Sequence, residues 1–240
     1  PDLLVFVHGY DIAPADNVRL RAAVSSLEQV ATQCNARAVI VSTNLREHPL
    51  VRNSPWIHTH GGALAAIGHL LGDHAARLVV ASSVPRNYNV PWGSHWQLDP
   101  LWSSGAMTIT HDGDDFSREQ KAWALAGEPP LPQHLRVCWE NRSPTGNCSV
   151  CDKCVNAMLL LEQAGQLDAY SVFQKPASFV ALLDNLPQTT FTRVYRAMCQ
   201  RGLPTDVEAA VLRLLQRTEQ AAKQPRLRKR IRSLVDKVFH

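Results

Sequence analysis

The sequence has no long hydrophobic run. No stretch of about 18 consecutive apolar residues occurs among its 240 residues, so no membrane-spanning helix is predicted. A secretory signal is also missing, because the first residues, PDLLVFVHGY, contain no basic segment and no small-residue cleavage site. We therefore expect no association with a membrane and a cytoplasmic location.

Charged residues are somewhat scarce, at 19% of the chain, and the basic ones are unevenly placed. Residues 223–237 carry seven basic side chains and one acidic one, a local charge of +6 in a chain whose net charge is +4. Such a segment could bind the phosphates of a nucleic acid. It is equally compatible with a solvated helix face whose apolar residues, among them Leu227 and Ile231, turn inward. Both interpretations stay open.

Short apolar segments alternate with longer helical ones in the first half of the chain. Strands are predicted at 3–8, 37–43, 77–83 and 107–112. Helices are predicted from a cap at Asp16 to about Cys34, within 55–72, and from Ser117 to about Ala126. Strands and helices in this order are typical of an α/β protein with a parallel, Rossmann-like sheet.

The second half of the chain has a different character. After a region that is rich in cysteine, residues 136–168, everything to His240 is predicted to be helical. Gly202 and Pro204 should end one helix, and Pro225 should open another. We therefore predict three parts, namely an α/β domain over 1–135, a cysteine region over 136–168 and a helical extension with a basic tail over 169–240.

Polar residues follow the predicted parallel strands. In open α/β sheets the loops at the carboxyl ends of the strands carry the ligand site. Here those loops are 8–14, 42–49 and 84–105, and the last is long and rich in tryptophan. Loops of this length in a compact domain are usually functional or disordered, and their tryptophans argue against disorder. A crevice lined by these loops would suit a polar or phosphate-bearing ligand.

Four of the six cysteines lie within the segment CWENRSPTGNCSVCDKC, at Cys138, Cys148, Cys151 and Cys154. Two overlapping CxxC steps and one more distant cysteine suit a closed, structural Zn²⁺ site. Disulfides would need an oxidising compartment, and an iron–sulfur cluster would use the same four ligands. We prefer zinc among these three. Cys34 and Cys199 lie on predicted helices and are expected to be small core residues.

The cysteine segment, with the helix that follows it and ends in Glu162-Gln163-Ala164-Gly165, resembles the zinc region of 7-cyano-7-deazaguanine synthases. These enzymes belong to the PP-loop ATP pyrophosphatases. A weaker, positional similarity covers residues 1–168 as a whole, including FVHGYD, IHTHGGALAAIGHLL, GSHWQLDPLWS and SREQKAWAL.

The resemblance implies an ATP-dependent ligase that uses Mg²⁺ and adenylates a carboxylate to form an amide or nitrile. It implies cofactor contacts from residues that follow the first strand and from the second helix, namely His8, Gly9, Tyr10, Asp11, His60 and Gly61. For a small-molecule or nucleobase-like substrate it implies Ser94, His95, Asp99 and Lys121. The catalytic residues are not identified, and a homodimer is left open.

Two departures from the family weigh against a true deazaguanine synthase. The S-G-G-x-D-S loop that cradles pyrophosphate in the family does not occur in this sequence, and the chain after about residue 170 extends beyond the family's zinc region. The alternative is a degenerate, non-catalytic module that contains zinc and binds a nucleotide or nucleic acid. Each residue of the predicted ligand site also has an ordinary structural alternative, such as a surface position for His60 and Lys121 or a turn for Asp99.

Overall fold

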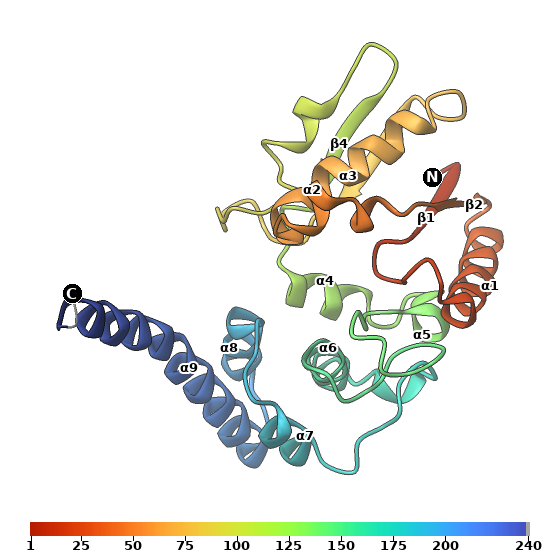
Figure 1. Cartoon of the computed structure of the whole chain (residues 1–240). Coiled ribbons are helices and arrows are strands. Elements are labelled where there is room, and N and C mark those ends of the chain that lie inside the picture. The colour runs from red at the N-terminus through yellow and green to blue at the C-terminus, as the bar shows by residue number, and fades with distance from the viewer. Residues whose placement is uncertain (239–240) are drawn as a thin grey trace. The chain divides into compact units, whose positions relative to one another are not determined.

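The computed structural model describes residues 1–238, and the side chains as far as Lys223 (Figure 1). The predicted basic segment 223–237 therefore lies, apart from its first residue, outside the described side chains. The chain forms two compact units. The first contains Pro1–Leu135 and Ser143–Gly146, and the second contains Arg136–Arg142 and the chain from Asn147 onward.

The first unit begins with a parallel β–α–β element. Strand β1 (Leu3–His8) pairs in parallel with β2 (Arg37–Ser42), and α1 (Asn17–Gln33) connects them and packs on both (Figure 1). The side chain of Asp16 accepts a hydrogen bond from the Arg19 amide, so the predicted cap of α1 is confirmed. Cys34, at the end of α1, is exposed, so its prediction as a core residue is wrong.

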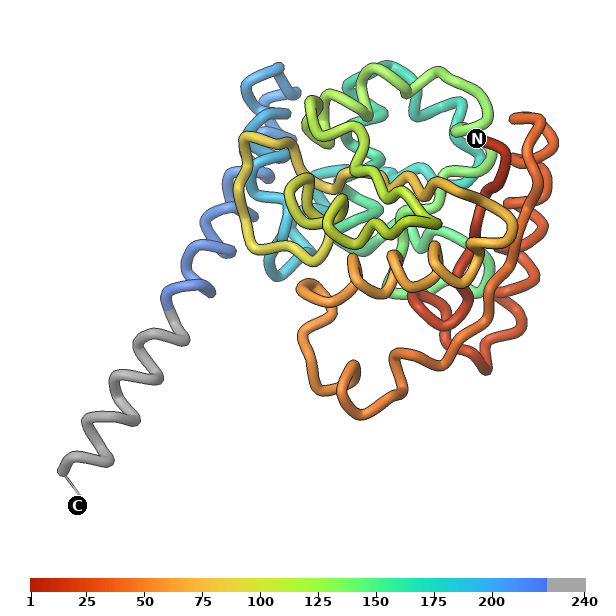
Figure 2. The backbone as a smooth tube through the Cα atoms, turned by 90° about the horizontal axis from the view of Figure 1, so that it is seen from above, coloured from red at the N-terminus to blue at the C-terminus, as the bar shows by residue number. Residues whose placement is uncertain are grey.

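A second parallel pair consists of β3 (Arg77–Ala81) and β4 (Thr108–Asp112). Helix α3 (Trp56–Leu70) packs against β3, and the orange ribbon of α3 can be followed in Figure 2. Ala65, Val80, Met107 and Ile109 form a small core here. The long connection between the two strands contains the short helix η2 (Asp99–Trp102), which contacts β4 and α3.

Short helices complete the first unit. They are η1 (Leu45–Glu47), α2 (Pro49–Arg52), α4 (Arg118–Leu125) and α5 (Leu131–His134). Helix α4 begins with a capping box in which Ser117 and Gln120 each bind the other's backbone amide. The sequence predicted this helix and its start at Ser117.

The protein is a mixed α/β structure with two short parallel strand pairs. Within the described residues these pairs are two separate two-stranded sheets, whereas one continuous parallel sheet was expected. Ile40 on β2 and Val79 on β3 remain 39% and 55% exposed, although strands in a parallel sheet are normally covered on both faces. Apolar runs predict where strands form, but which strands pair depends on contacts that a single sequence does not show.

The second unit is helical apart from its cysteine segment. It contains α6 (Asp152–Gln163), η3 (Leu167–Ala169), α7 (Phe179–Asn185), α8 (Thr192–Arg201) and α9 (Thr205–Val238) (Figure 1). Its core is contributed by α6, α8 and α9, and the most buried side chains include Met158, Tyr195, Met198, Val211 and Leu214. Cys199 is half-buried.

Helix boundaries in the second unit agree only partly with the sequence. Gly202, with φ of 106°, ends α8 as predicted, because a residue without Cβ adopts this backbone conformation at little cost. The prediction that Pro225 opens a new helix is wrong, since α9 is continuous over Thr205–Val238. Strong helix formers such as Gln, Lys, Arg and Leu flank this proline and favour continuation of the helix.

None of the helices described is both long and apolar enough to cross a membrane.

Candidate metal centre and strand-end residues

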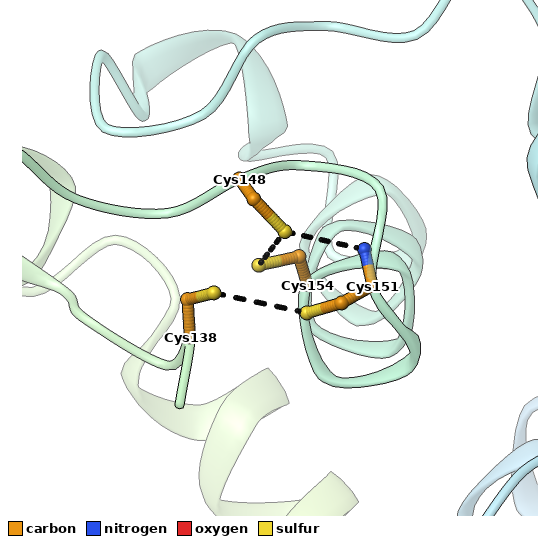
Figure 3. A group of neighbouring side chains, drawn as sticks. All are labelled: Cys138, Cys148, Cys151 and Cys154. Carbon is orange, nitrogen blue, oxygen red and sulfur yellow. Dashed lines mark hydrogen bonds between the residues drawn. The ribbon is translucent and has the colours of Figure 1, made fainter. Parts of the chain in front are cut away.

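The sulfur atoms of Cys138, Cys148, Cys151 and Cys154 lie within 4.8 Å of one another (Figure 3). The distance is 3.9 Å both from Cys138 Sγ to Cys151 Sγ and from Cys148 Sγ to Cys154 Sγ. Zn–S bonds of about 2.3 Å in a tetrahedron place sulfurs about 3.8 Å apart, so the cluster has the size of a tetrahedral metal site. These four cysteines could hold a metal ion.

Local backbone structure brings three of the sulfurs together. Cys151 is the N-cap residue of α6, so Cys154 lies in the first turn of this helix. Ser149 has φ of 61°, a left-handed conformation that turns the chain between Cys148 and Cys151. The Cys151 amide donates to Cys148 Sγ over 3.3 Å, as Figure 3 shows. This backbone N–H group stabilises negative charge on the sulfur that a metal would bind.

Asn147 positions the fourth cysteine. Its Oδ1 accepts hydrogen bonds from the amides of Val137 at 2.9 Å and Cys138 at 3.1 Å. The Asn147 side chain, which directly precedes Cys148, therefore holds the backbone at Cys138 next to the segment that carries the other three cysteines.

The free thiols shift one another's pKa values. Hydrogen bonding from the Cys154 thiol is the main reason why the pKa of Cys151 falls to about 5. Interaction with Cys151 and burial raise the pKa of Cys154, and burial raises the pKa of Cys148. One thiolate is thus favoured at neutral pH, and further thiolates need a cation between them.

The disulfide alternative is wrong for this structure. All six cysteines are free, and the closest sulfur pairs in the cluster are 3.9 Å apart, compared with about 2.05 Å in a disulfide. The choice between zinc and an iron–sulfur cluster depends on the metal and stays open here.

The predicted cofactor residues after β1 tie the β1 loop to its surroundings. The buried His8 ring contacts the Ala13 carbonyl through Nε2 at 3.1 Å. Gly9 has φ of 107°, and a Cβ at this position would lie 1.7 Å from the Thr43 carbonyl oxygen. The Tyr10 hydroxyl donates to the Ala63 carbonyl in α3 at 2.8 Å, while Asp11 is exposed. A ligand contact from these residues stays a prediction.

An aromatic group connects this loop with the start of α3. The rings of Tyr10 and Trp56 meet edge to face at 5.1 Å, and the Arg46 guanidinium lies 4.6 Å from the centre of the Trp56 ring. The His60 ring lies 5.7 Å from that of Trp92, so the long loop after β3 joins the same group.

The predicted phosphate approach at Gly61 is occupied by protein. A Cβ at Gly61 would lie 1.8 Å from the Gly93 carbonyl oxygen, so the missing side chain makes room for the backbone of the long loop. The close packing of the long loop explains the glycine, and a cofactor contact at Gly61 stays a prediction.

The predicted substrate residues Ser94, His95 and Asp99 come together around one carboxylate. Asp99 is 1% exposed and accepts hydrogen bonds from Ser94 Oγ at 2.7 Å and the His95 amide at 3.1 Å. It also pairs with His111 Nδ1 on β4 at 2.7 Å. Ser94 and Asp99 thus anchor the long loop to the sheet. His95 borders a shallow cavity of about 500 Å³ that is also lined by Trp92 and Leu98.

Lys121 lies apart from that network, at the carboxyl end of β3. Its Nζ donates to the Ser82 carbonyl at 3.0 Å, and burial and the nearby Arg118 lower its pKa. The neighbouring residues Ser117 and Gln120 line a cavity of about 310 Å³ together with Arg86 and Asp114. This is the strand-end position that parallel sheets commonly use for ligands.

Sequence reasoning missed several residues that organise these sites, notably His111 beneath the long loop and Asp152 beside the cysteines. A histidine on a strand and an aspartate at a helix start are common, and neither forms a motif with its distant partner.

Comparison with known proteins finds no matching family model, no matching curated protein and no matching solved structure.

Proposed function

We propose that the four cysteines hold a structural zinc ion. The observation that carries this proposal is the set of four sulfurs at tetrahedral spacing, three of them on buried residues, because four protein ligands fill the coordination of a tetrahedral zinc ion. The zinc would offset half of the charge of the four thiolates and fix the start of α6, as a structural rather than a catalytic ion.

Metal analysis of the purified protein tests this proposal. We expect about one equivalent of zinc per chain, and its loss in Cys148→Ser. Cys34→Ser is the matched control, because Cys34 is exposed and outside the cluster. Less than about half an equivalent of zinc, with iron in its place, would overturn the structural zinc in favour of an iron–sulfur cluster.

We propose further that the first unit is a nucleotide-binding α/β domain of the PP-loop type, from an enzyme that adenylates a carboxylate. Support comes from the resemblance of the cysteine region, from the parallel β1–α1–β2 element and from the polar residues at the ends of β1 and β3. The continuous Rossmann-like sheet of this family is part of the proposal.

Adenylation would activate a carboxylate, whose own oxygen is a very poor leaving group. The attack of the carboxylate on ATP releases pyrophosphate, and a nitrogen nucleophile then displaces AMP. The chain's residues would contribute position and charge, with Arg86 and Lys121 as the cations nearest the β3 end. The S-G-G-x-D-S loop that holds the pyrophosphate in this family does not occur among the 240 residues.

The assay for this reaction is the exchange of labelled pyrophosphate into ATP in the presence of candidate carboxylates. If the coding sequence upstream of Pro1 encodes an S-G-G-x-D-S loop about twenty residues before it, as the family pattern implies, the longer protein should catalyse this exchange. A longer protein that contains the loop and shows no exchange with any nucleobase-like or amino-acid carboxylate would count against the enzyme.

The second candidate is a zinc-containing module that binds nucleic acid. The charge of +6 in residues 223–237 favours it. It predicts binding to RNA or DNA that weakens steeply with salt, together with no turnover of ATP. Replacing Arg228, Lys229 and Arg230 by Gln should then reduce both the affinity and its salt dependence, while the zinc content stays unchanged.

A further inference from the structure

The segment that contains Cys148 and Cys151 also binds the chain that follows α6. We name residues 147–152 the metal loop. Besides holding the amides of Val137 and Cys138, Asn147 donates from Nδ2 to the Val172 carbonyl at 3.3 Å. The Asn147 side chain therefore joins the backbone at Cys138, the metal loop and Val172, which lies after α6.

Ser149 makes a second connection of the same kind. It is 3% exposed, and its Oγ accepts a hydrogen bond from the Gln174 amide at 2.9 Å. Its left-handed backbone conformation belongs to the turn between Cys148 and Cys151. The geometry of this turn therefore decides where the acceptor for Gln174 lies.

Asp152 makes the third connection, directly after Cys151. Its Oδ1 accepts from Thr189 Oγ1 at 2.7 Å, and its Oδ2 accepts from the Thr190 amide at 3.0 Å. Both threonines lie in the connection between α7 and α8. The carboxylate thus holds a loop that is 37 residues away in the sequence.

Thr189 is also hydrogen-bonded to residues of the last two helices. Its amide donates to Thr218 Oγ1 on α9 at 3.0 Å, and its own Oγ1 accepts from the Phe191 amide at the start of α8 at 2.9 Å. Thr189 is 5% exposed, so these groups have little access to water. The starts of α6 and α8 and the middle of α9 meet at this residue.

The three connections satisfy backbone groups that have no partner in regular structure, namely the amides of Gln174 and Thr190 and the carbonyl of Val172. Gln174 and Thr190 lie in irregular segments, and Val172 belongs to the same irregular stretch as Gln174. Ser149 and Thr189 are the buried members of these connections, and a lost bond to a charged acceptor such as Asp152 is more costly than the loss of a neutral one. The partners come from a loop whose shape depends on four sulfurs being held together.

We propose that metal occupancy at the four cysteines controls the packing of the C-terminal helices α7–α9, through Asn147, Ser149 and Asp152. With the metal bound, the metal loop presents these three side chains to residues 172–174 and 189–190. Without it, mutually repelling thiolates or loosely packed thiols no longer fix the loop, and the helices lose their attachment. We call this dependence of α7–α9 on the bound metal the latch. The latch rests on the metal site proposed above.

Hydrogen exchange measured by mass spectrometry on the full 240-residue protein tests the latch. Removal of zinc with a chelator should accelerate exchange about tenfold or more in peptides that cover 170–201, with no change in α1 and β1. Restoring zinc should restore protection. If chelation opens only 138–154 and leaves α7 and α8 protected, the latch is wrong.

Two variants separate the latch from metal binding itself. Asp152→Asn leaves only one acceptor oxygen for the two threonines, and Ser149→Ala removes the acceptor for Gln174. Each variant should keep about one zinc per chain, and should exchange about tenfold faster in 186–201 or in 170–178, respectively. Glu162→Gln, an exposed change on the same helix α6, should exchange like the wild type.

The outcomes distinguish the latch from the metal proposal. A protein that contains no bound metal contradicts the structural zinc, and the latch fails with it. Full zinc content with wild-type exchange in both Asp152→Asn and Ser149→Ala contradicts the latch alone. Should Asp152→Asn not fold, the milder Ser149→Ala still decides between these results.

Discussion

Asp99 and His111 are joined by a buried side-chain hydrogen bond beneath the long loop of the first unit. Asp99 Oδ2 lies 2.7 Å from His111 Nδ1, and their side chains are 2% and 4% exposed. The same carboxylate also binds Ser94 and the His95 amide, so it holds η2 and the preceding turn on β4. The loop that was predicted to bind substrate is therefore held on β4 by the hydrogen bonds of one buried carboxyl group.

Removing Asp99 should destabilise the protein strongly. Asp99→Ala leaves His111, the Ser94 hydroxyl and the His95 amide without their acceptor, and each buried group left unsatisfied typically costs about 1–3 kcal/mol. Chemical denaturation of the wild type and the variant measures this cost. His74→Ala, an exposed change in the same unit, should stay within about 0.5 kcal/mol of the wild type.

A double-mutant cycle tests whether the cost belongs to the pair. Once Asp99 is alanine, replacing His111 with leucine should cost much less than it does in the wild type, because the partner is already gone. Equal costs of the His111 change in both backgrounds would show that the two residues act independently, against the structure.

Zinc should raise the stability of the second unit. Zinc that binds only the folded protein adds about 2.7 kcal/mol when its free concentration is a hundredfold above Kd. Thermal unfolding should therefore shift to lower temperature after chelation and in Cys148→Ser. The matched variant Cys34→Ser should respond to chelation as the wild type does. An unfolding temperature that does not depend on zinc in the wild type would contradict a structural metal.

Local patterns in the sequence predicted much of the fold and failed where distant segments meet. Strands β1 to β4 and the starts of α1 and α4 follow from apolar runs and from capping by Asp16 and Ser117. The pairing of these strands into two separate sheets did not follow, because hydrogen bonding between strands depends on residues far apart in the sequence. Patterns of this kind therefore predict elements better than their arrangement.

The cysteine cluster was the most predictable site, since overlapping CxxC steps force neighbouring sulfurs together. The residues that support it left no such signal. Asp152 binds Thr189, 37 residues later, and Asp99 binds His111 across a chain reversal of 12 residues. A buried aspartate is recognisable only once its partner is known, so the sequence allowed Asp99 to be a turn residue or a substrate contact.

The pair of Asp114 and Arg86 should make stability depend on pH in the acid range. Arg86 binds Asp114 in a bidentate manner, at 2.7 and 3.2 Å, and this interaction holds the pKa of Asp114 below its ordinary value. An acid whose folded-state pKa is lowered stabilises the fold above its unfolded pKa of about 3.9 and loses this contribution as the pH falls further.

The comparison with Asp114→Asn isolates this effect. The wild type should exceed the variant in unfolding free energy at pH 7, and the difference should shrink as the pH falls through 4 and below. Asp168→Asn is the control, because Asp168 is exposed in its pair with Lys175. A difference between the wild type and Asp114→Asn that stays constant from pH 7 to pH 2 would contradict the assigned pair.

Gly9 should tolerate no side chain. Its φ of 107° disfavours any residue with a Cβ, and that atom would lie 1.7 Å from the Thr43 carbonyl oxygen, which is backbone and cannot rotate away. Gly9→Ala should therefore cost clearly more than the roughly 1 kcal/mol that alanine gains or loses at an unstrained glycine. Gly105→Ala is the matched control, since its added Cβ meets no atom within 4 Å. Denaturation of both variants measures the contrast, and equal stabilities would show that β1 does not meet the β2 loop as closely as the structure has it.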